Sequence, residues 1–368
     1  MNKNRNAFFA LLRAGLWEQG VRLQPYEPLD FDALFKMAKK QSVVGLLAAG
    51  LEHVEDRKVK KPEVLKFLKR VFSLEGKNQK VRRFIEDLMG RLRDAGIYAL
   101  MVKGQGLAEC YERPQWRPVG DVDLLLDEDN YLKAKALLLP MAESVKDEDI
   151  DKLHIGITID SWLVELHGTL HNGLSSRITR TVDRIQDETI RGGRVRMWRC
   201  GETDVPLPCV DNDIIFVFTH LLQHFFQGGV LLRQVCDWTR LLWTYRESID
   251  RDLLRERLDE MRLMSEWEVF AALAVDYLGC PSSAMPFYRD SSAIRRRAGR
   301  ALEVIFKTGS ADDNYKKETP AFKRKLITIW RQFLGTFTFI RIFPLDSLRF
   351  LGYFFVVGFS RTRKTTKL

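Results

Sequence analysis

The chain has 368 residues, enough for two or three domains, and its 45% hydrophobic content is that of an ordinary globular protein. Its net charge of +10 favours anionic partners such as nucleotides, nucleic acid or a lipid surface, but carries no information about the fold. Its five cysteines form no C-x-x-C pair, which argues against a structural zinc site and for a reducing compartment.

We expect a cytoplasmic protein without a membrane-spanning helix. The N-terminal apolar run, residues 7–12, ends at Arg13 and is too short for the core of a signal peptide. No uncharged apolar stretch reaches the roughly 18 residues that a spanning helix needs.

Residues 1–96 predict an N-terminal helical region. In residues 31–54 and 62–96, apolar side chains recur at spacings of three and four, which is the pattern of a helix with one apolar face. Pro62 suits a first helical turn, and Gly96 suits the cap at the end of the same helix.

Residues 97–205 predict a mixed core, because short apolar runs replace the helical pattern. Strands are expected at residues 97–102, 122–126, 152–159 and 162–168, and a helix at 130–141. Asp160 and Ser161 are turn-forming residues, so the last two strands are expected to form a pair.

The remainder of the chain is predicted to be mainly helical. Residues 206–308 form a C-terminal helical domain, and residues 309–320 have the composition of an exposed linker. Residues 321–368 form an aromatic, basic tail that either packs on the protein's own core or contacts a membrane surface. The fold class is therefore α+β: a small mixed β-sheet flanked by N-terminal and C-terminal helical regions.

Two aspartates lie at the start of the apolar strand 122–126, where an unpaired buried carboxylate would be costly. Strand alternation puts Asp121 and Asp123 on one face, and Gly120 before them allows a tight turn. Glu165 and His167 share one face of the strand 162–168 in the same way. If the two strands are neighbours, three carboxylates converge, and their repulsion favours a bound cation such as Mg²⁺ or Mn²⁺.

The segment after strand 97–102 has the features of a phosphate-binding turn. Gly104 and Gly106 open a helix whose backbone N–H groups can face an anion, and Lys103 adds a positive charge. Arg113 and Arg117 follow, and a guanidinium group can bind a phosphate bidentately. Each short motif is weak alone, but their order along the chain is informative.

This order resembles the nucleotidyltransferase superfamily of DNA polymerase beta, and within it a group of bacterial proteins described as uncharacterised nucleotidyltransferases. The resemblance covers roughly residues 60–245. It rests on Lys103-Gly104, Tyr111, Arg117, Gly120-Asp121-Val122-Asp123 and Glu165-Leu166-His167. Two features depart from the pattern: the usual Gly-Ser or Gly-Gly turn is Lys-Gly-Gln-Gly, and Glu165 stands where aspartate is common.

The resemblance implies a nucleotidyltransferase core in residues 97–205. Such an enzyme would use Mg²⁺ or Mn²⁺ to transfer a nucleoside monophosphate from an NTP, expected to be ATP, to a hydroxyl-bearing small molecule or protein. Nucleic acid is the less favoured acceptor, because no RNA-binding module is evident. The alternative is a non-catalytic nucleotide-binding or partner-binding protein that retains the fold. The catalytic and metal-binding residues would be Asp121, Asp123 and Glu165, and the nucleotide-binding residues Lys103, Gly104, Arg117, Gly120 and His167.

Other polar residues have both a functional and a structural interpretation. His220 and His224 are four apart on a helix, as metal ligands can be, but a third ligand is not evident and core histidines are favoured. Arg233 and Asp237 have the same spacing and predict either an ion pair on a helix surface or side chains that face the cleft, of which the surface pair is favoured. Trp116 is suited either to stacking on a base or to an exposed loop.

Overall fold

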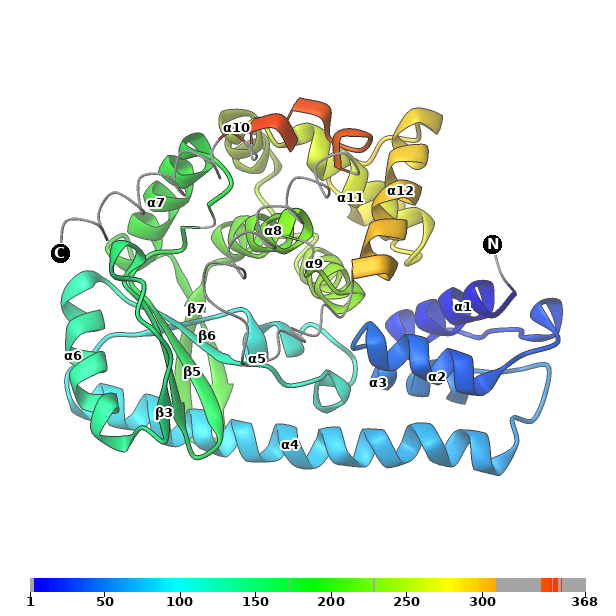
Figure 1. The fold of residues 1–368 in the computed structure, drawn as a ribbon, viewed down its shortest axis with the longest axis horizontal. Helices are drawn as coiled ribbons and strands as arrows, with labels where there is room; N and C mark the ends of the chain where they lie inside the picture. The colour runs from blue at the N-terminus through cyan, green and yellow to red at the C-terminus, as the bar shows by residue number, and fades with distance from the viewer. Residues whose placement is uncertain are drawn as a thin grey trace, which may run out of the picture. The chain divides into compact units, whose positions relative to one another are not determined.

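The predicted α+β fold is observed in a computed structural model, in which a small mixed sheet has helical regions before and after it in the chain (Figure 1). The structure describes residues 3–171, 173–227, 229–308, 339–345, 347–349 and 352. The first of two compact units comprises Met1–His171, Val182–Val217 and Cys236–Ile249. The second comprises Asn172–Thr181, Phe218–Val235 and Asp250–Leu368.

The first unit begins with three short helices, α1 (Lys3–Trp17), α2 (Phe31–Lys40) and α3 (Val44–Glu52). The helical stretch predicted at 31–54 is thus two helices. Asp30 caps α2 by accepting a hydrogen bond from the Ala33 N–H at 3.0 Å. Helices α1 and α3 cross at very short range, since a Cβ atom at Gly15 would lie 1.9 Å from the Leu46 carbonyl oxygen.

Helix α4 (Lys61–Asp94) extends from the N-terminal helices to the β-strands of the same unit (Figure 1). It begins and ends where the sequence predicts, with Pro62 in its first turn and Gly96, at a positive φ of 70°, just beyond its end. In its second half, one stripe of side chains is buried, and the three-and-four spacing of Val81, Ile85, Leu88 and Leu92 produces it.

The central sheet has five strands: β1 (Leu100–Val102), β2 (Val122–Leu125), β3 (Ser144–Val145), β4 (His154–Ile159) and β5 (Trp162–His167). Their order is β1-β2-β5-β4-β3, with β2 and β5 parallel and the other neighbours antiparallel. The predicted pair β4–β5 is confirmed. Its turn residues Asp160 and Ser161 both have positive φ values, as a two-residue type I′ hairpin requires.

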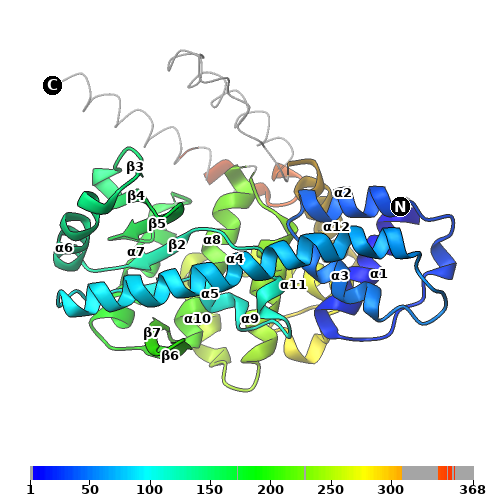
Figure 2. The ribbon, with the colours of Figure 1, turned by 90° about the horizontal axis from the view of Figure 1, so that it is seen from below.

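The other elements of the first unit pack around this sheet. Helix α5 (Gly104–Ala108) follows β1, and α6 (Glu128–Leu138) lies against β5. A second, two-stranded sheet of β6 (Val195–Cys200) and β7 (Thr203–Pro208) packs against β1 and α4. Figure 2 shows α4 passing beside this hairpin. The apolar residues of α4, α6, the central sheet and the β6–β7 hairpin form one core.

The second unit is helical in the part that the structure describes. Helices α7 (Ser176–Ile190), α8 (Val210–Gln227) and α9 (Leu232–Thr244) belong partly to each unit, whereas α10 (Arg251–Met261), α11 (Met264–Asp276) and α12 (Ser292–Thr308) lie wholly in the second. Aromatic rings dominate its core: Phe218 packs on Trp267, and Phe343 on Phe225 and Phe270. Short 3₁₀ helices in the chain cover Gln24–Tyr26, Pro114–Trp116, Leu139–Met141, Ile150–Lys152 and Ser282–Ala284.

The aromatic tail predicted at 321–368 is described only at residues 339–345, 347–349 and 352. Phe339, Ile342 and Phe343 are buried, so this described portion packs on the protein's own core. The linker predicted at 309–320 lies outside the described residues. Among the helices that the structure describes, none has the length and apolar character needed to cross a membrane.

Candidate functional site

The carboxylates predicted to converge come from two neighbouring strands. Asp123 of β2 is in register with Glu165 of the parallel strand β5, so both side chains lie on the same face of the sheet. Asp121 comes directly before β2 and is exposed, whereas Asp123 is buried. Partial desolvation, followed by the charges of Asp123 and Glu165, raises the pKa of Asp121. The three carboxylates are therefore close enough for their negative charges to repel one another.

Asp123 is held by two basic side chains. The Lys103 Nζ atom and the His167 Nε2 atom lie 3.0 Å and 2.9 Å from the same oxygen, Asp123 Oδ1. Burial lowers the pKa of His167, which favours a neutral imidazole that donates its Nε2–H to the carboxylate. These two contacts fix the orientation of the Asp123 carboxylate, and they hold the Lys103 ammonium group beside the first residues of β2.

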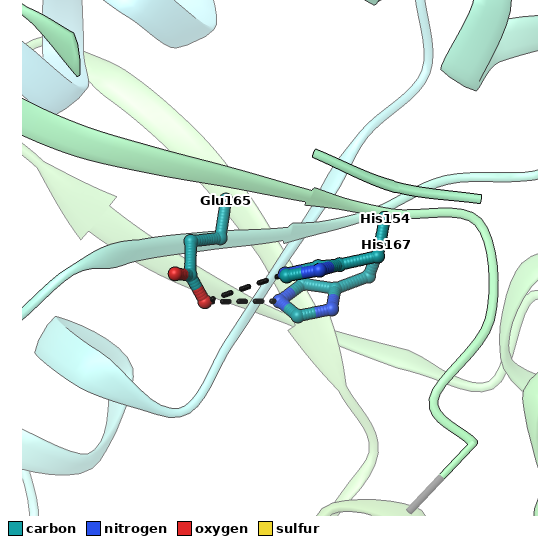
Figure 3. Close-up of side chains that lie close together, drawn as sticks. All are labelled: His154, Glu165 and His167. Atoms are coloured by element: carbon teal, nitrogen blue, oxygen red, sulfur yellow. Dashed lines mark ion pairs between the residues drawn. The ribbon is translucent and has the colours of Figure 1, made fainter. Parts of the chain in front are cut away.

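Glu165 has a separate set of partners. Its Oε1 accepts a hydrogen bond from Lys146 Nζ at 2.9 Å, and its Oε2 lies 3.5 Å from His154 Nε2 and 4.0 Å from His167 Nε2 (Figure 3). The hydrogen bond from His154 and the one from Lys146 lower the pKa of Glu165 to about 2, against the opposing effect of burial. Glu165 is therefore a carboxylate at any physiological pH.

His154 and Lys146 are site residues that the sequence interpretation missed. The β4–β5 hairpin pairs His154 with His167, and their ring centroids are 4.7 Å apart. A signal for His154 was present, because a two-residue turn at 160–161 fixes the strand register and places 154 opposite 167. Lys146 follows β3, the short edge strand, and gave no comparable signal.

His154, Glu165 and His167 form a group able to hold a metal ion, since one ligand atom from each lies within 4.8 Å of the others (Figure 3). Imidazole nitrogen with carboxylate oxygen suits Mn²⁺ or Zn²⁺, whereas the carboxylates of Asp121 and Asp123 suit Mg²⁺. The mutual repulsion of these carboxylates also fits a cation among them. The donor set is therefore compatible with a divalent metal.

The turn after β1 is conformationally unusual. Lys103 adopts φ 60° and ψ −140°, a conformation that residues with a side chain rarely adopt, and Gly104 follows with φ 45°. Such strain is typical of functional sites, where the surrounding structure maintains it. Gly106, in contrast, is a packing glycine, since a Cβ atom there would lie 2.9 Å from a Leu207 methyl group. Gly120 is exposed beside Asp121.

Arg117 is buried and forms a bidentate ion pair with Asp237. Its Nε and Nη2 atoms donate to the two carboxylate oxygens, each at 2.8 Å, and Tyr111 donates its hydroxyl to Asp237 Oδ1 at 2.7 Å. Asp237 is therefore not on a helix surface, which corrects the position expected from its spacing with Arg233. The nucleotide contact expected of Arg117 stays a prediction, because its observed partner is this carboxylate.

The remaining candidates lie away from the carboxylates. Arg113 pairs with Glu18, just beyond α1, and with Glu52 of α3, and its guanidinium stacks on Trp116 at 4.4 Å. Trp116 donates its ring N–H to Glu75 Oε1 at 2.7 Å.

His220 and His224 lie with their Nε2 atoms 3.1 Å apart. Within the described residues they belong to no group of three potential metal ligands.

In a comparison with protein families, residues 27–279 match a family described as uncharacterised nucleotidyltransferase. No curated protein and no solved structure matches the chain. The matched region contains the whole central sheet, the carboxylates on β2 and β5 and the Lys103–Gly104 turn. The chain belongs to this nucleotidyltransferase family and is a transferase of that type.

Proposed function

We propose that the protein transfers a nucleoside monophosphate from an NTP, with ATP the expected donor, to a hydroxyl group on a small molecule or a protein side chain. One observation carries the proposal: Asp123 and Glu165 are register partners on parallel strands, with Asp121 beside them. Membership of the nucleotidyltransferase family supports nucleotidyl transfer as the reaction.

Asp121 and Asp123 would hold the metal, Mg²⁺ or Mn²⁺, with Glu165 completing the site. A bound divalent ion would neutralise phosphate charge and make the acceptor oxygen more nucleophilic. In the geometry described, Asp123 Oδ1 already accepts from Lys103 and His167, so Asp123 would offer its other oxygen. Glu165, with a pKa of about 2, is too weak a base to take a proton at neutral pH, which favours a ligand role.

Lys103 and Gly104 would contact the phosphates of the nucleotide. The Lys103 side chain lies beside the carboxylates of Asp121 and Asp123, with 14% of its surface exposed. Its positively charged Nζ atom is 3.0 Å from Asp123 Oδ1. An incoming triphosphate would find this charge beside the carboxylates that bind its metal. Gly120 directly precedes Asp121 and is therefore next to the same carboxylates. His167 would act by orienting Asp123, and its nucleotide contact stays a prediction.

Calorimetry with ATP and Mg²⁺ tests the proposal. Wild-type protein is expected to bind ATP only with the metal present, and Asp121→Asn and Asp123→Asn are each expected to abolish binding. Asp129→Asn is the matched control, since Asp129 is an exposed carboxylate six residues beyond Asp123, outside the site. Equal binding by wild type and the two site variants would contradict the proposal. Binding without release of pyrophosphate to any acceptor would favour the non-catalytic alternative.

A further inference from the structure

The second unit contains an arginine-lined cavity of about 780 Å³, which shares no residue with the carboxylate site. Its lining comes from Arg262, which follows α10, from helices α11 and α12, and from residues 341–345 and Arg349. One carboxylate, Glu266, is among the described lining residues. Six arginines surround the same space: Arg262, Arg296, Arg297, Arg300, Arg341 and Arg349.

Two of these arginines hold one wall of the cavity in place. Arg297 donates from Nε to the Ile342 carbonyl oxygen at 2.6 Å and from Nη2 to Ser265 Oγ at 2.7 Å. Arg300 donates from Nη1 to the Arg341 carbonyl oxygen at 3.0 Å. These hydrogen bonds link α12 both to α11 and to residues 341–342, so the wall is tied to the helices.

The positive charge in the cavity exceeds what the surrounding carboxylates neutralise. Arg296 and Arg300 are exposed and four residues apart on α12, a spacing at which like charges repel. Arg295, next to Arg296 on the same helix, pairs with Asp290 at 2.6 Å and Asp276 at 3.4 Å and does not line the cavity. In the described part of the chain, the structure gives no ion pair to Arg262, Arg296 or Arg341.

We propose that this cavity binds a small organic phosphate that carries at least two negative charges. Guanidinium groups bind phosphate oxygens bidentately, and several arginines around one space can hold a doubly charged group. The volume lies within the range of small-molecule sites. Pro344 and Leu345 are exposed and add apolar surface for the organic part, Leu345 with 64% of its surface exposed. The concave shape distinguishes this site from a flat surface for lipid or nucleic acid.

Calorimetry on the full chain with inorganic pyrophosphate as the probe, in EDTA, tests the charge-binding half of the proposal. Wild type is expected to bind, and the double variant Arg296→Gln/Arg300→Gln is expected to bind about 100-fold more weakly, because removing each guanidinium from the phosphate weakens binding about tenfold. Arg295→Gln is the matched control on the same helix and is expected to bind as wild type does. Arg296→Lys/Arg300→Lys, which keeps the charge, is expected to lie between.

Two further comparisons make the result decisive. Asp121→Asn/Asp123→Asn is expected to bind pyrophosphate as tightly as wild type, because the cavity is independent of the carboxylate site. Thermal unfolding of the double arginine variant is expected to lie close to that of wild type, since both side chains are exposed and the one hydrogen bond lost, from Arg300 to the Arg341 carbonyl oxygen, is itself exposed. The proposal is overturned if wild type gives no binding, or if the double arginine variant binds pyrophosphate as tightly as Arg295→Gln does.

Discussion

Arg117 and Asp237 are 120 residues apart in the sequence and form a buried, bidentate ion pair. Only 5% of each side chain is exposed. Burial alone would lower the pKa of Arg117, but the adjacent carboxylate outweighs it and raises the pKa above its ordinary value. Because Arg117 lies four residues before Asp121, the pair ties the segment that carries the aspartates to helix α9.

Removing one partner of this pair is expected to be severely destabilising. Asp237→Ala would leave the guanidinium buried without its carboxylate and cost about 3–5 kcal/mol in the free energy of unfolding. Arg117→Met/Asp237→Leu, which removes both charges, is expected to recover much of this loss. Urea denaturation followed by tryptophan fluorescence measures both. A loss below about 1 kcal/mol for Asp237→Ala would show that the pair does not stabilise this segment.

The hairpin and its carboxylate were predictable from the sequence, whereas the partner of Arg117 was not. Strand alternation and the turn at Asp160 and Ser161 are local signals, and they correctly placed Glu165 and His167 on one face. Parallel pairing of β2 with β5 needed the resemblance, because nothing local brings residues 123 and 165 together. Asp237 lies on α9, far from Arg117 in the sequence. Its spacing with Arg233 suggested a position on the helix surface, but the structure shows that Asp237 is buried.

Substitution of Gly104 tests whether the strained turn matters for stability. Gly104 has a φ of 45°, in the left-handed region that a residue with a Cβ atom rarely adopts. Gly104→Ala is therefore expected to lower the free energy of unfolding by about 1–2 kcal/mol. Gly76→Ala is the matched control: Gly76 lies within α4 with open space around its Cα, so the substitution is expected to stabilise by about 0.5–1 kcal/mol. Thermal unfolding measures both, and opposite signs are expected. A stabilising Gly104→Ala would contradict the account.

Glu165 is expected to contribute a pH-dependent stability. Its pKa is about 2 in the folded protein against an ordinary value of 4.5, so the contribution is fully present above about pH 5 and is lost as pH falls toward 2. The shift corresponds to about 3 kcal/mol. In EDTA, the stability difference between wild type and Glu165→Gln should therefore shrink from about pH 6 to about pH 3. A difference that stays constant over this range would contradict the lowered pKa.

The group of His154, Glu165 and His167 is expected to bind Mn²⁺ in the absence of nucleotide. His154→Ala removes one imidazole ligand and is expected to weaken Mn²⁺ binding about tenfold or more. His171→Ala is the control, because His171 pairs with Asp183 at 2.6 Å outside this group. Electron paramagnetic resonance of titrated Mn²⁺ measures the affinity. Equal affinity in the two variants would mean that His154 is not a ligand.

The central claim is that nucleotidyl transfer takes place at the site formed by Asp121, Asp123 and Glu165. Following the α-phosphate of ATP tests this claim most directly. Wild-type protein, Mg²⁺ and a cell extract as the source of acceptors would be incubated with ATP labelled at the α-phosphate or, separately, at the γ-phosphate. The α-label is expected to appear on an acceptor while the γ-label appears in pyrophosphate, and Asp121→Asn/Asp123→Asn should show neither. Transfer of the γ-label to the acceptor, or α-label transfer undiminished in that variant, would contradict the account.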